Sequence, residues 1–518
     1  MRIFFRFCVI VILIIYFADI IVFKGFFTRL TIVDILKNIK EIKVVQYLFT
    51  DVFNFFEKIQ IICLFLVGVF GGWLFISDKT APSKLFKNSI VFAAAIFLLI
   101  GVTGSEKGYV HSWLYKNVFE LNRINGNEIP YSEEFKKNTL QKTQDILAQD
   151  PIEIEPKKVN IIILCFESLS MYHSKFFSGL NDFTPAIDRI AKDNSAFINF
   201  YSNGFATESG LVAMLRGECL IPKVKKYCNN GMGFFSFCKS QPSLPRKLKN
   251  YGYRSEFITT GDLRFNNKGQ WLKSLGFNYI EGSTHPYYEN WERFHFNAAP
   301  DEALYERLKQ RIKDLGSEKP YFLFAETVST HHPFLDPIKK SRKEQDVFRY
   351  ADKQLGDFYD YLKTTSFFDN SLLIIVSDHR SMTPVRSQEV KKYKDRIFAR
   401  IPLIVVDGKS HPKIITEAFQ QTDLYHSIIG LVSGEITLSL FTGMLLTDNL
   451  IPPKYILYPR GDQRDVITVY NKNKSGNVKL AGDNTAFING KVDNSSLVIN
   501  KINFERLKKQ CICPPATQ

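Results

Sequence analysis

The 518-residue sequence lacks any feature that would concentrate its positive charge in one place. Its formal net charge is +15, from 67 Lys and Arg residues against 52 Asp and Glu residues. Such a balance suits either nucleic acid or an anionic membrane surface. Because the sequence contains no zinc-finger pattern, no block of basic residues and no internal repeat, we expect a membrane partner and no nucleic acid.

A signal-peptide cleavage site is also missing. The apolar run at residues 7–23 is long for a cleaved signal, and no small-x-small motif follows it. Residues 59–76 and 85–103 form two further apolar runs. Each of the three is close to the length that crosses a bilayer core of about 30 Å. Residues 1–104 are therefore predicted to be a retained transmembrane anchor of about three helices.

The basic residues that flank these runs predict their orientation. Arg2 and Arg6 favour a cytoplasmic N-terminus, and lysines within residues 79–87 favour a cytoplasmic second loop. Three crossings then place the rest of the chain outside the membrane. Because the loop at residues 24–58 also carries lysines, a further crossing near residues 44–56 stays open, and three or five crossings are preferred over four.

Cysteines give less information. Cys219, Cys228 and Cys238 lie close together in the sequence. An extracytoplasmic compartment permits disulfides, but their connectivity cannot be read from sequence. Both a bond within this group and free thiols stay open.

From residue 158 onward the pattern is that of an α/β domain. Branched apolar runs at residues 159–166, 321–327 and 370–379 predict strands that are buried on both faces. Amphipathic stretches such as residues 350–365 predict helices between them. Strands that alternate with helices indicate a mostly parallel sheet flanked by helices.

The remaining segments complete the predicted domain organisation. Residues 158–459 form the α/β domain, and residues 105–157 are assigned to a linker or to interfacial helices. Residues 460–518 are rich in Asn, Gly and Lys and predict hairpins, in a small antiparallel C-terminal part.

Metal-ligating side chains follow the predicted strands. Glu167 ends the first strand, Asp378 and His379 end the third, and His331 and His332 follow the second. The carboxyl ends of parallel strands meet at one edge of a sheet, where ligands gather. Carboxylate and imidazole ligands suit zinc, manganese or magnesium. Each residue also has a structural explanation: Glu167 could cap a helix, and Asp378 and His379 could form a turn at the end of a strand. These explanations do not account for polar ligands at the ends of three strands.

Four segments also carry a family resemblance: "NIIILCFES", "TPAIDRIAKDNSAFINFYSNGFAT", "THHPF" and "IIVSDH". In this order they resemble the alkaline phosphatase and sulfatase superfamily. The resemblance is closest to lipoteichoic acid synthases and related phosphoglycerol and phosphoethanolamine transferases of the bacterial envelope. It implies an alkaline phosphatase-like fold in a multi-pass protein of the bacterial inner (plasma) membrane, with a periplasmic or extracytoplasmic catalytic domain.

The resemblance implies a metal-assisted nucleophile. Glu167, Asp378 and His379 fall on the family's metal ligands, and Thr207 falls on its nucleophile, which is also a ligand. A bound divalent cation lowers the pKa of a hydroxyl and holds it in line for attack. We expect one such metal, zinc or manganese, with magnesium as the alternative.

The family's substrate contacts map with departures. His331 matches the histidine of an H-x-P segment, and His332 is the second choice. Arg380 follows the Asp-His pair, where it either binds phosphate or pairs with an acid such as Glu208.

Further departures lie around residues 260–268. Thr260 stands where the teichoic acid enzymes have histidine, Asp262 is retained, and Lys268 ends the segment that replaces their Trp-Asn-Arg run. These changes weaken a glycerol-phosphate pocket, although Asp262 and Lys268 remain predicted substrate contacts.

The resemblance implies a two-step transfer. Thr207 attacks the phosphodiester of a phospholipid donor, and a hydroxyl of an envelope glycan then takes the substituted phosphate. The departures near Asp262, and cysteines suited to an oxidising periplasm, favour phosphoethanolamine transfer onto lipopolysaccharide or another surface sugar. One alternative is a phosphoglycerol transferase of lipoteichoic acid or periplasmic glucan type. A sulfuric ester hydrolase is disfavoured because the C/S-x-P-x-R motif is absent, and an inactive lipid- or glycan-binding module is disfavoured by the intact ligand set.

Overall fold

The computed structural model of the protein describes most of the chain beyond residue 150. The described residues are 11–12, 14–23, 29–31, 62, 118, 131–142, 151–221, 234, 242–316, 319–332, 334–409, 411–463 and 465–511. The chain divides into two compact units, which are described separately. The first comprises residues 1–127, 383–392 and 461–463, and the second comprises the rest.

The first unit contains a helical segment at residues 14–23. Its buried Asp19 pairs with Arg29 at 2.7 Å and accepts a hydrogen bond from the backbone N–H of Leu30. No helix within the described residues is both long and apolar enough to span a bilayer. The apolar runs predicted at residues 59–76 and 85–103 lie outside the described residues, apart from residue 62. The anchor therefore stays a prediction.

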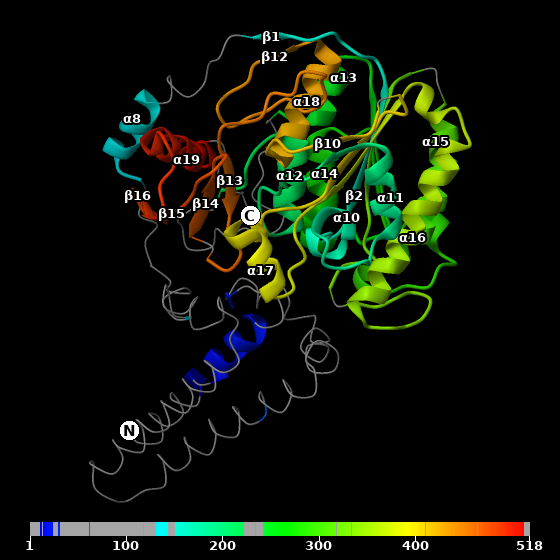
Figure 1. The fold of residues 1–518 in the computed structure, drawn as a ribbon, viewed down its shortest axis with the longest axis horizontal. Helices are drawn as coiled ribbons and strands as arrows, with labels where there is room; N and C mark the ends of the chain where they lie inside the picture. The colour runs from blue at the N-terminus through cyan, green and yellow to red at the C-terminus, as the bar shows by residue number, and fades with distance from the viewer. Residues whose placement is uncertain are drawn as a thin grey trace, which may run out of the picture. The chain divides into compact units, whose positions relative to one another are not determined.

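An eight-stranded sheet forms the centre of the second unit (Figure 1). Every neighbouring pair is parallel except the two pairs made by β9, which is antiparallel to both neighbours. The mostly parallel sheet is thus confirmed. In spatial order the strands are β10 (Lys413–Ile415), β3 (Ser195–Phe197), β9 (Leu403–Val406), β8 (Ser371–Ser377), β2 (Asn160–Phe166), β7 (Tyr321–Glu326), β5 (Arg254–Thr259) and β6 (Tyr279–Glu281).

The central strands are apolar throughout because both of their faces are covered. In β2, Ile161, Ile163 and Cys165 belong to one large core cluster, whereas Ile162 and Leu164 point to the opposite face and are equally buried. This burial explains why β2 shows a continuous apolar run instead of alternation.

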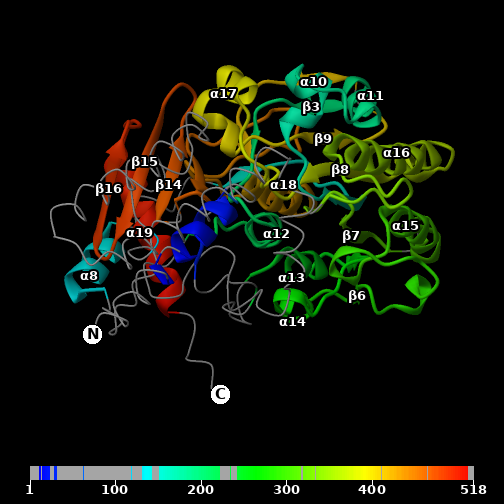
Figure 2. The same cartoon turned by 90° about the horizontal axis from the view of Figure 1, so that it is seen from below.

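Helices cover the two faces of the sheet (Figure 2). On one face lie α11 (Pro185–Asp193), α15 (Asp301–Leu315) and α16 (Glu344–Lys363), which pack against one another. On the other lie α12 (Thr207–Arg216), α13 (Leu244–Lys249), α14 (Lys268–Leu275) and α18 (Gln421–Ser433). Shorter elements of the second unit are α8 (Glu133–Gln141), α10 (Lys175–Ser178), β1 (Ile152–Glu153), β4 (Phe200–Tyr201), β11 (Phe419–Gln420) and β12 (Glu435–Ile436). The short helix α17 (Ser387–Tyr393) belongs to the first unit apart from its last residue.

The C-terminal part is a separate antiparallel sheet rather than an edge of the main one. Its four strands are β13 (Ile456–Pro459), β14 (Val466–Tyr470), β15 (Ser475–Ala481) and β16 (Asn484–Asn489), in that spatial order. A helix, α19 (Ser495–Cys511), follows them. Leu457, Val469, Val478 and Val498 belong to a core cluster of their own. The antiparallel prediction is therefore confirmed, with a terminal helix added.

Cys219 is buried. Its Sγ lies 3.6 Å from the carbonyl oxygen of Leu457. Cys228 and Cys238 lie outside the described residues, so the predicted alternatives for this cysteine group, a bond within it or free thiols, both stay predictions.

Candidate active site

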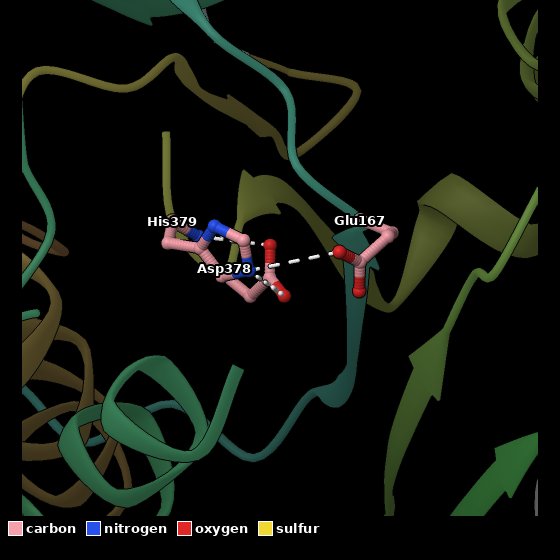
Figure 3. A group of neighbouring side chains, drawn as sticks. All are labelled: Glu167, Asp378 and His379. Carbon is pink, nitrogen blue, oxygen red and sulfur yellow. Dashed lines mark hydrogen bonds and ion pairs between the residues drawn. The ribbon is translucent and has the colours of Figure 1, made fainter. Parts of the chain in front are cut away.

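Three side chains meet at the carboxyl edge of the central sheet (Figure 3). Glu167 follows β2 directly, and Asp378 and His379 follow β8 directly. Because β2 and β8 are neighbours in the sheet, their ends bring these residues together. One ligand atom of each residue lies within 4.8 Å of the others, and all three residues are buried. Two carboxylates and one imidazole form a donor set suited to a divalent cation.

The imidazole of His379 is oriented for ligation. Its Nδ1 lies 2.8 Å from the carbonyl oxygen of Arg380, which can only accept, so Nδ1 carries the hydrogen. Its Nε2 faces Asp378 Oδ2 at 3.2 Å and Glu167 Oε1 at 3.6 Å. A hydrogen bond on the far nitrogen that fixes the tautomer is the usual support of a metal-binding histidine.

The charge balance of the cluster calls for a cation between these groups. Burial lowers the pKa of His379, but Asp378 and Glu167 outweigh it and raise that pKa to about 9. Burial raises the pKa of Asp378, yet His379 and hydrogen bonds outweigh it and hold the pKa below its usual value. Without a metal, the imidazole of His379 is therefore protonated on Nε2, and its positive charge faces the two carboxylates. A divalent cation would displace this proton on binding.

Asp378 keeps one oxygen available. Its Oδ1 accepts from the backbone N–H of Ser168 at 2.9 Å and of His379 at 2.8 Å. Its Oδ2 is buried and faces His379 Nε2 at 3.2 Å, and it accepts no hydrogen bond from any other described residue. A buried carboxylate oxygen is costly unless a positive charge faces it, and a metal ion can supply that charge in place of the His379 proton, so the residues present fit a metal ion.

Thr207 lies beside this cluster at the first position of the ten-residue helix α12. Its Oγ1 is 3.4 Å from His379 Nε2, and the residue is partly exposed. The helix approaches Asp378 through Gly210, where a Cβ would stand 2.2 Å from the Asp378 carbonyl oxygen. Only glycine permits this approach, which brings the Thr207 hydroxyl to the three ligand side chains.

His331 and His332 lie after β7 in the structure, as the sequence predicts. The ring of His331 packs edge-on against Phe296 at a centroid distance of 4.5 Å. Burial, with the nearby charges of His295 and His379, lowers the pKa of His331 to about 3, and burial lowers that of His332 to about 4. Both rings are therefore neutral at neutral pH and offer polar atoms rather than positive charge.

The predicted substrate contacts Asp262 and Arg380 make local bonds. Asp262 pairs with Arg264 of its own loop at 2.7 Å, and that hydrogen bond lowers the pKa of the Asp262 carboxyl. Arg380 is buried and donates from Nη1 to the carbonyl oxygen of Ser381 at 2.6 Å. The carboxylate of Glu208, the acid considered as a partner for Arg380, accepts from Asn266 at 3.0 Å.

Lys268 carries an unexpected partner. Its Nζ lies 2.7 Å and 2.8 Å from the two carboxylate oxygens of Glu326, the last residue of β7. Burial lowers the pKa of Lys268, but the charge of Glu326 outweighs it and raises that pKa above its usual value. This predicted substrate contact is thus already neutralised by a carboxylate.

Sequence reasoning missed three residues near the ligands, of which Gln421 and Ser168 bond to ligand residues and Glu326 pairs with Lys268. Glu326 ends a predicted strand, so the rule that selected Glu167 could also have found it. Gln421, at the start of α18, donates to the backbone oxygens of Ser377 and Asp378, but no sequence motif marks it. Ser168 donates hydrogen bonds to Glu167 and Asp378, and only its place directly after a ligand candidate could have drawn notice.

The α/β part of the chain is similar in sequence to known proteins. A family model described as Sulfatase matches residues 159–434. Phosphoglycerol transferase I of Escherichia fergusonii is 26% identical over 260 residues, which cover 46% of this chain and 33% of that relative. The chain therefore spans about a third of the length of this curated relative.

Two solved structures share the fold. A protein of the alkaline phosphatase superfamily from Vibrio parahaemolyticus has a TM-score of 0.54 and 20% identity, over 74% of this chain and 97% of its own. The lipoteichoic acid synthase LtaP from Listeria monocytogenes has a TM-score of 0.54 and 17% identity, over 72% of this chain and 96% of its own. At these identities the likeness concerns the architecture alone.

Proposed function

Because the chain belongs to the Sulfatase family, we propose that it is a metal-dependent phosphotransferase that works through a covalent intermediate on Thr207. The observation that carries this proposal is the meeting of three ligand atoms within 4.8 Å, beside the hydroxyl of Thr207. Glu167, Asp378 and His379 would hold one divalent cation together with Thr207. We favour zinc or manganese, with magnesium as the alternative.

The bound metal would lower the pKa of the Thr207 hydroxyl and stabilise charge on the phosphoryl oxygens. The protein itself orients the reacting groups. Helix α12 presents Thr207 at its N-terminus, where backbone N–H groups favour an anionic phosphoryl group. The Arg380 carbonyl holds the His379 tautomer, and the neutral ring of His331 can accept a hydrogen bond from the leaving or attacking hydroxyl.

The proposed reaction has two steps. The Thr207 oxygen forms a bond to the phosphorus of a phospholipid headgroup, and the bond from phosphorus to the diacylglycerol oxygen breaks. The diacylglycerol oxygen takes the proton that Thr207 gives up. In the second step a hydroxyl oxygen of an envelope glycan forms a bond to the phosphorus, and the bond from phosphorus to the Thr207 oxygen breaks. The Thr207 oxygen takes the proton that the glycan hydroxyl gives up.

The charges around Lys268 favour phosphoethanolamine as the transferred group. Glu326 already neutralises the ammonium of Lys268, so this lysine is not a lone cation for a second phosphate contact. The charge of Glu208 also acts on Lys268 and on Glu326, so among these three described residues two carboxylates face one ammonium. A headgroup that carries its own ammonium complements this surplus, whereas a neutral glycerol does not.

Phosphoglycerol transfer is the second candidate. It is favoured by the name of a relative, Phosphoglycerol transferase I, and by the retention of Asp262. Sulfuric ester hydrolysis fits less well because Thr207 cannot be converted into formylglycine. A catalytically inactive binding module fits poorly with a complete cluster beside a partly exposed hydroxyl.

We further propose where the reaction takes place. A lipid donor places the site near a membrane, in keeping with an anchor at residues 1–104 and a linker at residues 105–157. Residues 158–459, with the extension at 460–518, would then face the periplasm or the cell exterior of a bacterium. Lipopolysaccharide or another envelope glycan would be the acceptor.

The donor is tested with the purified full-length chain in vesicles. Phosphatidylethanolamine or phosphatidylglycerol, each with a radiolabelled headgroup, is supplied with lipopolysaccharide and Zn²⁺ or Mn²⁺. We expect label to move from phosphatidylethanolamine and not to move in the Thr207→Ala variant. Movement from phosphatidylglycerol alone would establish the second candidate instead, and equal transfer by Thr207→Ala would remove Thr207 as nucleophile. Glu208→Gln should reduce the preference for the cationic headgroup.

A further inference from the structure

Ser168 directly follows the metal-ligand candidate Glu167, in the turn after β2. Its hydroxyl donates to Glu167 Oε1 at 2.7 Å, and its backbone N–H donates to Asp378 Oδ1 at 2.9 Å. The residue is buried. A single residue therefore contacts the carboxylates of two candidate ligands that come from two different strands.

The backbone of Ser168 adopts an unusual conformation to make both contacts. Its φ angle is 57°, in the left-handed region that favours glycine and disfavours residues with a Cβ. Strained conformations of this kind persist where the surroundings require them, and they gather at functional sites. Here the strained turn aims the N–H at Asp378 while the side chain returns to Glu167.

Conformation alone does not explain why a serine stands here. Glycine would adopt the same φ without strain, but it would leave Glu167 Oε1 without the hydroxyl donor. That same oxygen faces His379 Nε2 at 3.6 Å, so the hydroxyl holds the carboxylate oxygen that points into the cluster. The hydrogen bond from the Ser168 hydroxyl to Glu167 thus offsets the conformational energy of the left-handed backbone.

We propose that Ser168 is a positioning residue that presets the metal site, its hydroxyl orienting Glu167 and its N–H orienting Asp378. The inference rests on the proposed function, because it assumes that these carboxylates bind a divalent cation. Hydrogen bonds that hold metal ligands typically change metal affinity by about 10- to 100-fold when they are removed.

Two substitutions separate the effect of the hydroxyl from that of the backbone strain. Ser168→Ala removes the hydroxyl and keeps the Cβ, and with it the strain of the positive φ. Ser168→Gly removes both the hydroxyl and the strain. Ser170→Ala is the matched control. Its hydroxyl accepts from the backbone N–H of Ser381 at 2.9 Å, so it ties the same loop to the segment after β8 without touching a ligand carboxylate.

The experiment measures the affinity of the full-length chain for Zn²⁺ and Mn²⁺ by calorimetry with a competing chelator, and the melting temperature of the metal-free form. We expect both Ser168 variants to lose about 10- to 100-fold in affinity, while Ser170→Ala binds as the parent does. Ser168→Gly should melt above Ser168→Ala because the strain is gone.

Two results would overturn the role of Ser168. Parental metal affinity in both Ser168 variants would show that the hydroxyl does not position Glu167. Parental affinity in Ser168→Gly alone would show that only the backbone conformation counts. A parent chain that binds neither metal would refute the proposed metal site itself and this inference with it, and that result is distinct from the other two.

Discussion

The buried ion pair between Lys268 and Glu326 yields the most quantitative prediction. Glu326 Oε1 lies 2.7 Å from Lys268 Nζ, and the side chains are 3% and 16% exposed. We consider three variants: Glu326→Gln, Lys268→Met and the double variant. Each single change leaves the other partner as an unpaired buried charge, whereas the double change leaves none.

The size of the effect follows from burial. Removing one partner of a buried pair costs about 3–5 kcal/mol, because the remaining charge stays desolvated. Since Lys268 is partly exposed, we expect the lower end, about 3 kcal/mol, for each single variant. The double variant leaves no unpaired charge and should lose only about 1 kcal/mol, which corresponds to a coupling energy of about 5 kcal/mol between the two single losses. The exposed pair Arg189–Asp360, whose side chains are 44% and 52% exposed, supplies the control. Asp360→Asn should cost at most about 1 kcal/mol.

The assay is urea unfolding of the full-length chain in detergent, followed by tryptophan fluorescence. Trp271 lies buried in α14, the helix that Lys268 begins, and reports on this region. A coupling energy near zero, or a Glu326→Gln variant as stable as Asp360→Asn, would show that Lys268 and Glu326 do not form the desolvated pair described above.

Three further predictions concern the nucleophile, its helix and the histidines. Thr207→Ala should abolish transfer without a loss of melting temperature, whereas Thr207→Ser should retain measurable turnover in the vesicle assay. Gly210→Ala should destabilise the protein by about 1–3 kcal/mol and weaken Zn²⁺ binding, because its Cβ would stand 2.2 Å from the Asp378 carbonyl oxygen. Gly261→Ala should do neither, because the added Cβ would stand 3.4 Å from Val328 Cγ2, an ordinary contact distance. The pKa of His332 falls from about 6.5 when unfolded to about 4 when folded, because the buried ring is held neutral. The contribution of this neutral ring to the free energy of unfolding is complete above pH 6.5 and is lost as the pH falls towards 4. At most about 3 kcal/mol is lost over this window, and His332→Gln should flatten that part of the stability profile measured by urea unfolding.

The positions of the ligand candidates could be predicted because they depend on topology alone. Parallel strands end at one edge, so Glu167 and the pair Asp378–His379 had to approach each other once β2 and β8 became neighbours. The direction of β9 could not be predicted in the same way. A buried apolar run looks alike whichever way the strand points, and β9 is antiparallel to both neighbours.

The contacts around the ligands depend on geometry that sequence patterns do not contain. Lys268 and Glu326 are 58 residues apart and meet only because α14 begins near the end of β7. The positive φ of Ser168 follows from the two contacts that it makes at once, and serine has no intrinsic preference for that region. Asp262 pairs with Arg264, two residues away, a local bond that competes with the predicted substrate contact.

The most direct test of a covalent intermediate on Thr207 is intact-protein and peptide mass spectrometry after rapid mixing with phosphatidylethanolamine and no acceptor. The account predicts an added phosphoethanolamine on the peptide that contains Thr207, which disappears when a glycan acceptor is supplied. Phosphoethanolamine found instead on Ser209 or Ser202, or transfer to acceptor with no labelled peptide at any mixing time, would contradict it.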